Sequence, residues 1–300
     1  WEMTVFKNMK TRTKLVILLL LVGTIPGLAV YGVFQHERTT IQGVFADNYS
    51  TVGVSLLEVI DRNLFERYGD VQAFGYNTSA YDPANWKNPS EDNPLIVAMN
   101  NYAVAYGFYP VMLLINPQGE LLAVNTKSPK GEAIKTAALY HKNYKDEVWF
   151  QDALNGKYLE GRDGLTGTAV GAPQRNPIVA DVYGNDGFVI PFSAQVKNTH
   201  GELVGVWVNF ADFSLVEQII GSARQDLLDN GLDDPDLMLF DKNGVQLVDY
   251  DPSNLDKDGH LKRDFENVIL KKNFINMGVQ AAKFAAEGKR GKTFEPNPDN

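Results

Sequence analysis

The stretch LVILLLLVGTIPGLAVYGVF, residues Leu15–Phe34, runs for twenty residues without a charge. At about 1.5 Å of rise per residue, a helix of this length spans the roughly 30 Å hydrocarbon core of a bilayer. Basic residues directly precede it, namely Lys7, Lys10, Arg12 and Lys14. Because positive charge stays on the cytoplasmic side, we predict that residues 1–14 are cytoplasmic, that residues 15–34 form a transmembrane helix, and that the rest lies outside.

A cleavable signal peptide is the alternative interpretation of this stretch, since it also combines a charged start with an apolar middle. The apolar run here is longer than the roughly 7 to 15 residues usual in signal peptides. No A-x-A cleavage site follows it. The sequence therefore favours a membrane anchor.

The composition of the chain limits its functions. Three hundred residues with 44% hydrophobic content are enough for one large core or two small ones. A net charge of -9 leaves no basic surface for nucleic-acid phosphates, so nucleic acid is not an expected partner. The absence of cysteine excludes disulfides and thiolate metal sites, and it suits an oxidising compartment such as a bacterial periplasm.

A long helix is expected directly after the apolar stretch. Apolar residues recur there every three or four positions, at Ile41, Phe45, Tyr49, Val52, Leu56, Ile60, Leu64, Tyr68 and Val71. This spacing predicts one helix over residues 35–75, continuous with the membrane helix and forming a rod of roughly 60 Å. The apolar stripe can pack against a second copy of the chain or against the chain's own domain, and both can hold on different faces.

Three β-hairpins are predicted, at residues 109–124, 188–210 and 237–250, each with Pro, Asn or Gly at its turn. The first and third are alike, MLLINPQGELLAVN (112–125) against LMLFDKNGVQLVDY (237–250). A repeat about 125 residues apart indicates two tandem copies of one module. We predict an α/β (α+β) fold with antiparallel sheets in both modules.

Helices are predicted around these hairpins, over Pro94–Tyr106, over Leu215–Leu228 as a connector, and over Arg263 to about Glu287. No strand pair follows the third hairpin to close its sheet. We therefore expect a complete module at residues 76–214, a connector at 215–235, and an incomplete module at 236–300 that continues in a longer protein.

Several segments together carry a resemblance to a known family. They are DRNLFERYGDVQAF (61–74), DEVWFQDALNGKY (146–158), FVIPFSAQVKNTHGELVGVWVNFADFSLV (188–216) and DLMLFDKNGVQLV (236–248). In this order, after a basic start and one membrane helix, they resemble the periplasmic double Cache sensor of bacterial methyl-accepting chemotaxis proteins. The resemblance covers about Lys10 to Asn300.

The resemblance implies two tandem PAS-like Cache modules, with a small-molecule pocket in the membrane-distal one. It also implies a homodimer, a second membrane helix, a HAMP linker and a cytoplasmic rod beyond residue 300 that contacts a chemotaxis kinase and its adaptor. Two alternatives remain: the same sensor on a histidine kinase or cyclic-dinucleotide enzyme, or a periplasmic binding protein that is merely anchored.

The sequence offers no arrangement typical of catalysis. The four histidines lie far apart, without an H-x-x-x-H spacing, and no G-x-S-x-G motif is present. We therefore expect no enzyme activity, no metal site and no cofactor.

Aromatic residues and one acid mark a candidate binding site. Tyr144, Trp149 and Phe150 lie in one short segment, and PIVADVY (177–183) brings Asp181 and Tyr183 to the start of the next strand. Aromatic walls with a buried carboxylate suit a small cation, because ring faces attract ammonium and a desolvated carboxylate pairs with it. The alternative is that the aromatic side chains are only core.

In double Cache sensors for amino acids, an Arg two residues before a Trp-Tyr pair binds the ligand's carboxylate, and a later Asp binds its amino group. The resemblance matches Trp149 and Phe150 to the pair and Asp181 to the acid. Glu147 stands at the Arg position. If Glu147 faces the pocket, its negative charge repels a ligand carboxylate that an Arg would attract. Two unit charges interact by about 4 kcal/mol at ~4 Å and an effective dielectric of ~20, so Glu147 then favours an amine, a polyamine or another cation. Arg162 and Arg175 could instead supply an anion contact.

Overall fold

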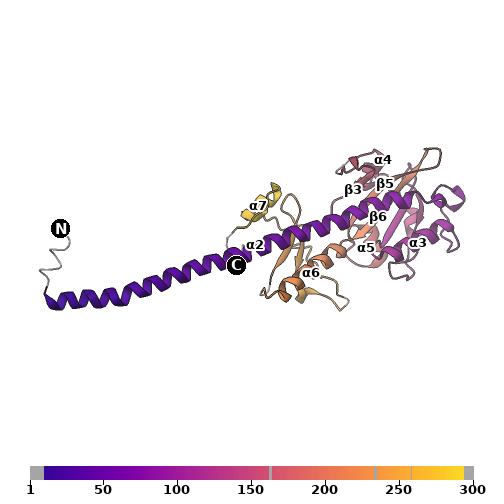
Figure 1. Cartoon of the computed structure of the whole chain (residues 1–300). Coiled ribbons are helices and arrows are strands. Elements are labelled where there is room, and N and C mark those ends of the chain that lie inside the picture. Colours follow the sequence, from indigo (N-terminus) through magenta and orange to yellow (C-terminus); the bar gives the residue numbers. More distant parts are fainter. Residues whose placement is uncertain (1–9, 162–163, 233–234, 258, 294–300) are drawn as a thin grey trace.

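The computed structural model describes residues 10–161, 164–232, 235–257 and 259–293. It has an α+β fold in which one long helix carries two antiparallel sheets. Figure 1 shows the larger sheet at the end of this helix that lies away from the N-terminus, with the smaller sheet nearer its middle. Of the basic residues before the apolar stretch, Lys7 lies outside the described residues, as do residues 294–300 of the second module.

The helix α2 runs without a break from Thr11 to Gly75 and so contains both predicted helices. It is long and apolar enough to cross a membrane, and the apolar window found in it has no buried residue. From Ile60 onward its apolar stripe packs against the chain's own domain, with Ile60, Tyr68 and Val71 buried and Leu64 half-buried, whereas Ile41 and Phe45 are exposed. Burial against its own domain therefore accounts for the far half of the stripe and leaves the near half open.

The larger sheet contains six strands, in the order β2-β1-β6-β5-β3 with β4 paired to β5. All its pairings are antiparallel. The strands are β1 Val111–Ile115, β2 Leu121–Val124, β3 Thr168–Val170, β4 Gln174–Arg175, β5 Phe188–Lys197 and β6 Leu203–Asp212. The first two predicted hairpins are thus confirmed as β1–β2 and β5–β6.

Both faces of this sheet are covered. The end of α2 and α3 (Pro94–Tyr106) pack on one face, while α4 (Val148–Leu154) and α5 (Pro177–Tyr183) pack on the other. Because side chains alternate along a strand, Met112 belongs to the core under α2 and α3, whereas Leu113 belongs to the core under α4 and α5.

The second module is smaller in the part that the structure describes. Before it lies α6 (Ser214–Asp229), which confirms a helix at the predicted Leu215–Leu228 and packs against α2. The third predicted hairpin is confirmed as β7 (Leu237–Phe240) and β8 (Gln246–Tyr250). Short 3₁₀ helices lie at Thr78–Ala80, Pro83–Asn85, Ala137–His141 and Pro252–Asn254, and α7 spans Gln280–Ala286.

The predicted helix from Arg263 to about Glu287 is wrong for most of its length, since only α7 is helical. Near its start, the carboxylate of Asp264 accepts hydrogen bonds from the backbone N–H groups of Glu266 and Asn267, as at the beginning of a helix, but no helix continues from there. Leu270 then has a left-handed φ of 61°. Its N–H donates to the carbonyl of Gln246 at 2.9 Å. Pairing with the start of β8 thus replaces the hydrogen bonds that a helix would make.

Candidate functional site

The predicted aromatic residues lie together under α4, in the core of the larger sheet. Tyr144, Trp149 and Phe150 are 2%, 3% and 0% exposed. The ring centroids of Tyr144 and Trp149 are 6.2 Å apart, and Trp149 makes an edge contact with Phe210 of β6 at 5.4 Å. Their side chains are therefore packed as core, which is the alternative that the sequence left open.

Glu147 supports this cluster from the start of α4. It occupies the position before the first helical residue, and its carboxylate accepts a hydrogen bond from the indole N–H of Trp149 at 3.0 Å. Burial, and after it the negative charge of Glu147, raises the pKa of Tyr144 above its ordinary value. Glu147 thus acts on the cluster itself, holding the ring of Trp149 in one orientation.

Asp181 is exposed, so the expectation of a buried carboxylate was wrong. It lies within a helix, α5, rather than at the start of a strand. Asn176 caps this helix by accepting the N–H of Ile178. Because Ile178 and Val179 face the sheet, Asp181 falls on the outer side. There its carboxylate forms an ion pair with Lys142 at 3.0 Å, with exposed fractions of 64% and 42%.

Tyr183 is the last residue of α5 and connects this end of the helix to the sheet. Its hydroxyl donates a hydrogen bond to the carbonyl of Pro110 at 2.9 Å, next to the start of β1. Burial raises the pKa of Tyr183 above its ordinary value, so this hydroxyl keeps its proton at neutral pH. The contact fixes α5 against the sheet.

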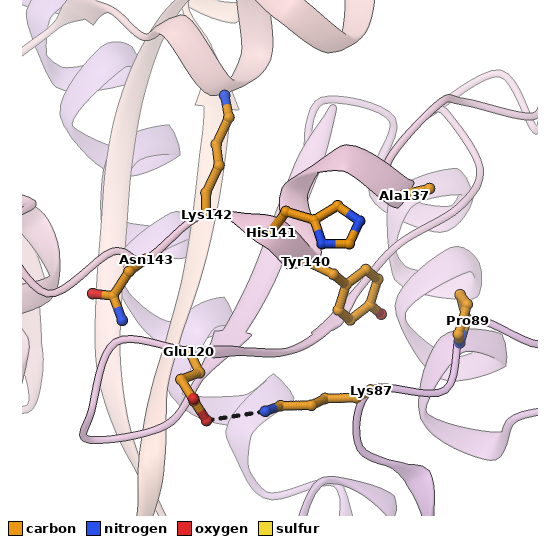
Figure 2. Close-up of a pocket in the computed structure, with 8 residues that line it drawn as sticks. All are labelled: Lys87, Pro89, Glu120, Ala137, Tyr140, His141, Lys142 and Asn143. Atoms are coloured by element: carbon orange, nitrogen blue, oxygen red, sulfur yellow. Dashed lines mark hydrogen bonds and ion pairs between the residues drawn. The ribbon is translucent and has the colours of Figure 1, made fainter.

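A cleft of about 480 Å³ lies beside β2, and Lys142 belongs to its wall. The residues that line it are Lys87, Pro89, Glu120, Ala137, Tyr140, His141, Lys142 and Asn143 (Figure 2). Lys87 and Glu120 form an ion pair across the cleft at 3.0 Å. The hydrogen bond from Lys87 lowers the pKa of Glu120, and that from Asn116 lowers it further.

The ring of Tyr140 lies in this cleft between His141 and Lys87 (Figure 2). Burial raises the pKa of Tyr140 to about 12, so its hydroxyl is neutral at physiological pH. The cleft therefore combines the ring of Tyr140 with one carboxylate, that of Glu120, which Lys87 holds. The Lys142 side chain extends away from that ring (Figure 2), so its ion pair with Asp181 lies beside the cleft and not in its lining. Such a set of groups can bind a small charged molecule by exchanging one partner of an ion pair for the ligand.

Sequence reasoning missed the cleft because three distant segments form it. The backbone N–H of Lys87 donates to the carbonyl of Leu122 in β2 at 2.7 Å. On the other side of the β1–β2 turn, the N–H of Tyr144 donates to the carbonyl of Gly119 at 2.8 Å. No local pattern around Lys87 or Glu120 distinguishes these residues from an ordinary polar loop.

Two further groups bear on the binding chemistry. Arg175, the alternative anion contact, lies with its guanidinium over the ring of Phe265 at 4.9 Å. Arg162, the other alternative, lies outside the described residues. Within the described part of the chain, no group of three or more histidine and acidic side chains could hold a metal ion.

No protein-family model and no curated protein matches this sequence. Solved structures do match. The ligand-binding domain of the amino-acid chemoreceptor PctC of Pseudomonas aeruginosa, in complex with GABA, is 14% identical, with 77% of this chain and 80% of that one covered and a TM-score of 0.46. The sensory domain of the chemoreceptor Tlp3 of Campylobacter jejuni is 12% identical, with 70% and 74% covered and a TM-score of 0.48.

A third similar structure is the ligand-binding domain of the chemoreceptor CtaA of Pseudomonas fluorescens, in complex with L-serine. It is 12% identical, with 75% of this chain and 74% of that one covered and a TM-score of 0.44. All three of these structures are ligand-binding or sensory domains of bacterial chemoreceptors, the class of protein that the sequence motifs resemble.

Proposed function

We propose that this chain is the sensor part of a chemoreceptor in the bacterial inner membrane, with its modules in the periplasm. The observation that supports this most is that α2 contains the apolar stretch and also belongs to the core of the larger sheet. Near its far end, the hydroxyl of Tyr68 donates to the carbonyl of Leu159, and the hydroxyl of Thr168 donates to the carbonyl of Tyr68, each at 2.8 Å. A shift of the sheet region therefore moves the helix that crosses the membrane.

A small ligand binds in the membrane-distal module, residues 76–214, and the connector and the module at 236–300 follow it toward the membrane. Binding favours one arrangement of α2 over another, by a differential affinity of a few kcal/mol. The chain works as a homodimer and passes its signal to a cytoplasmic chemotaxis kinase and its adaptor.

The ligand is an amine or another small cation, and Asp181 is its partner. An exposed ion pair contributes only about 0–1 kcal/mol, so a ligand ammonium can replace the ammonium of Lys142 at Asp181 with little loss. The ring of Tyr140 offers a face for a cation in the adjoining cleft. The net charge of -9 also raises the local concentration of cations.

The remaining predicted site residues take part by positioning the walls of this site. Tyr144, Trp149 and Phe150 hold the segment before α4, and α4 itself, against the sheet, and Glu147 orients Trp149. Tyr183 holds α5, which carries Asp181. A ligand that contacts the buried rings directly would need α4 to move outward.

The Asp181→Asn variant tests the ligand assignment. We would titrate the full chain in lipid nanodiscs with putrescine, choline, GABA, L-serine and succinate, following thermal stabilisation and heat of binding. The unmodified chain should prefer putrescine or choline, and Asp181→Asn should weaken that binding by up to about fivefold, because an exposed ion pair contributes up to about 1 kcal/mol. The control Asp152→Asn, another acid paired with a lysine, should bind like the unmodified chain.

A second variant gives the sign of the ligand's charge. Lys142→Gln removes the cation that competes for Asp181, so it should tighten the binding of putrescine. If the ligand were an anion held by Lys142, the same change would weaken its binding. Tightest binding of succinate, or undiminished binding of amines by Asp181→Asn, would exclude the amine proposal.

The homodimer can be tested by cysteine cross-linking, since the chain has no cysteine of its own. Single cysteines along Ile41–Val59 should cross-link between two chains in membranes at intervals of three or four residues, as expected for parallel helices. The exposed positions Ile41 and Phe45 should react, whereas a cysteine at the buried Ile60 should not. Uniformly absent cross-links would indicate a monomeric anchor.

A further inference from the structure

The side chain of Arg263 joins two carboxylates that lie far apart in the sequence. Its Nε and Nη2 donate to the two oxygens of Glu217 at 2.6 and 2.8 Å. Its Nη1 donates to both oxygens of Asp186, at 3.0 and 2.9 Å. The side chains of Arg263 and Glu217 are only 10% and 5% exposed, and that of Asp186 is 27% exposed. One guanidinium therefore holds both acids in a mostly buried position.

These three residues come from three different parts of the fold. Asp186 lies between α5 and β5 in the distal module, Glu217 lies in the first turn of α6, and Arg263 lies in the segment after β8. Two aromatic rings lie beside this cluster. The guanidinium of Arg263 is 5.3 Å from the ring of Phe188, which makes an edge contact with Phe265 at 5.2 Å. We call these five residues, Asp186, Phe188, Glu217, Arg263 and Phe265, the seam. The seam thus joins both modules and their connector.

This cluster is better suited to fixing the relative orientation of its side chains than to raising the free energy of unfolding. A buried ion pair loses most of its Coulomb attraction to desolvation, so an apolar pair of similar volume is often as stable. In agreement with this, burial raises the pKa of Glu217 even though the hydrogen bond from Arg263 lowers it. A planar guanidinium bound to both oxygens of a carboxylate does, however, fix the orientation of both groups.

We propose that Arg263 is a positioning residue that joins the α5–β5 loop to α6, so that the distal and proximal modules move as one body. Few contacts separate α5 from α2 along this connection, because Asp186 follows α5 closely in the sequence and α6 packs against α2. A shift of α5, which carries Asp181, is then transmitted to α6 and to α2. The meaning of this joint for signalling rests on the proposed function, whereas the mechanical coupling does not.

The test measures a distance between the modules without any ligand. Nitroxide labels at Val148→Cys on α4 and Met277→Cys in the proximal module are unique, since the chain has no cysteine, and both positions are exposed. Pulsed electron resonance on the full chain in nanodiscs should give one narrow distance distribution. The double variant Arg263→Met/Glu217→Leu removes the two most buried charges of the cluster and leaves only Asp186, which is 27% exposed; it should broaden the distribution or add a second distance.

Two further variants make the result specific. The control Arg67→Met removes another mostly buried guanidinium, one whose carboxylate partners Glu66 and Asp70 both lie in α2, and should leave the distribution narrow. Asp186→Asn removes the distal carboxylate alone and should broaden it, which covers the case in which the double variant does not fold. Circular dichroism identifies folded variants. A narrow, unshifted distribution in a folded Arg263→Met/Glu217→Leu chain, or in Asp186→Asn, would overturn the proposal.

Discussion

Replacing Phe74 with alanine is expected to lower the free energy of unfolding by about 3–5 kcal/mol. This ring is 2% exposed in the last turn of α2. It stacks on Tyr102 of α3 with centroids 4.1 Å apart and meets Trp207 of β6 at 6.3 Å. Its removal leaves a cavity where the long helix, α3 and the sheet meet, and the surrounding rings cannot fill it fully.

Phe65→Ala is a matched control, because Phe65 lies on the same helix and is 58% exposed. It should change the free energy of unfolding by no more than about 0.5 kcal/mol. Urea unfolding followed by circular dichroism measures both variants. Equal effects of the two substitutions would mean that the end of α2 is not part of the distal core.

The single variant Arg263→Met should be strongly destabilising at neutral pH, by about 3–5 kcal/mol, because it leaves Glu217 buried without its cation. The loss should shrink as the pH falls. In the unmodified chain, burial already raises the pKa of Glu217 above its ordinary value of 4.5, although Arg263 opposes the shift. Without Arg263 the folded-state pKa of Glu217 rises further.

The sign of this pH dependence follows from the raised pKa. An acid with a raised folded-state pKa stabilises the fold below its unfolded pKa and loses that contribution as the pH rises through the folded pKa. Arg263→Met should therefore be closest to the unmodified chain near about pH 5 and furthest from it near about pH 8. In the double variant Arg263→Met/Glu217→Gln, the loss in free energy of unfolding relative to the unmodified chain should be the same at both pH values. A loss independent of pH in Arg263→Met would show that Glu217 is not the group responsible.

Most elements of the fold could be predicted because local rules determine them. The spacing of Ile41, Phe45 and Tyr49 is enough to predict a helix, and Pro94 after the capping Asn93 marks the start of α3. The hairpins follow from their turn residues, such as Gly119, whose positive φ of 83° suits glycine. Each of these features depends on residues close together in the sequence.

The site was predicted less well because it depends on tertiary contacts. Asp181 was placed at a strand entry, although Asn176 and Pro177 repeat the Asn-Pro start of α3 and begin the helix α5; only its ion pair with Lys142 depends on a distant segment. The cleft arises where segments from both sides of β2 meet, and the joint at Arg263 lies in a segment that was predicted as a helix. In both cases the deciding partners lie dozens of residues away in the sequence.

A small molecule bound to the distal module is expected to change the arrangement of α2 in the membrane. The direct measurement is the rate of cross-linking between Ile41→Cys chains in nanodiscs, with and without the tightest binder among putrescine, choline, GABA, L-serine and succinate. The rate should change on ligand binding in the otherwise unmodified chain, and Asp181→Asn should need a correspondingly higher ligand concentration for the same change. An identical rate with and without bound ligand would contradict the claim.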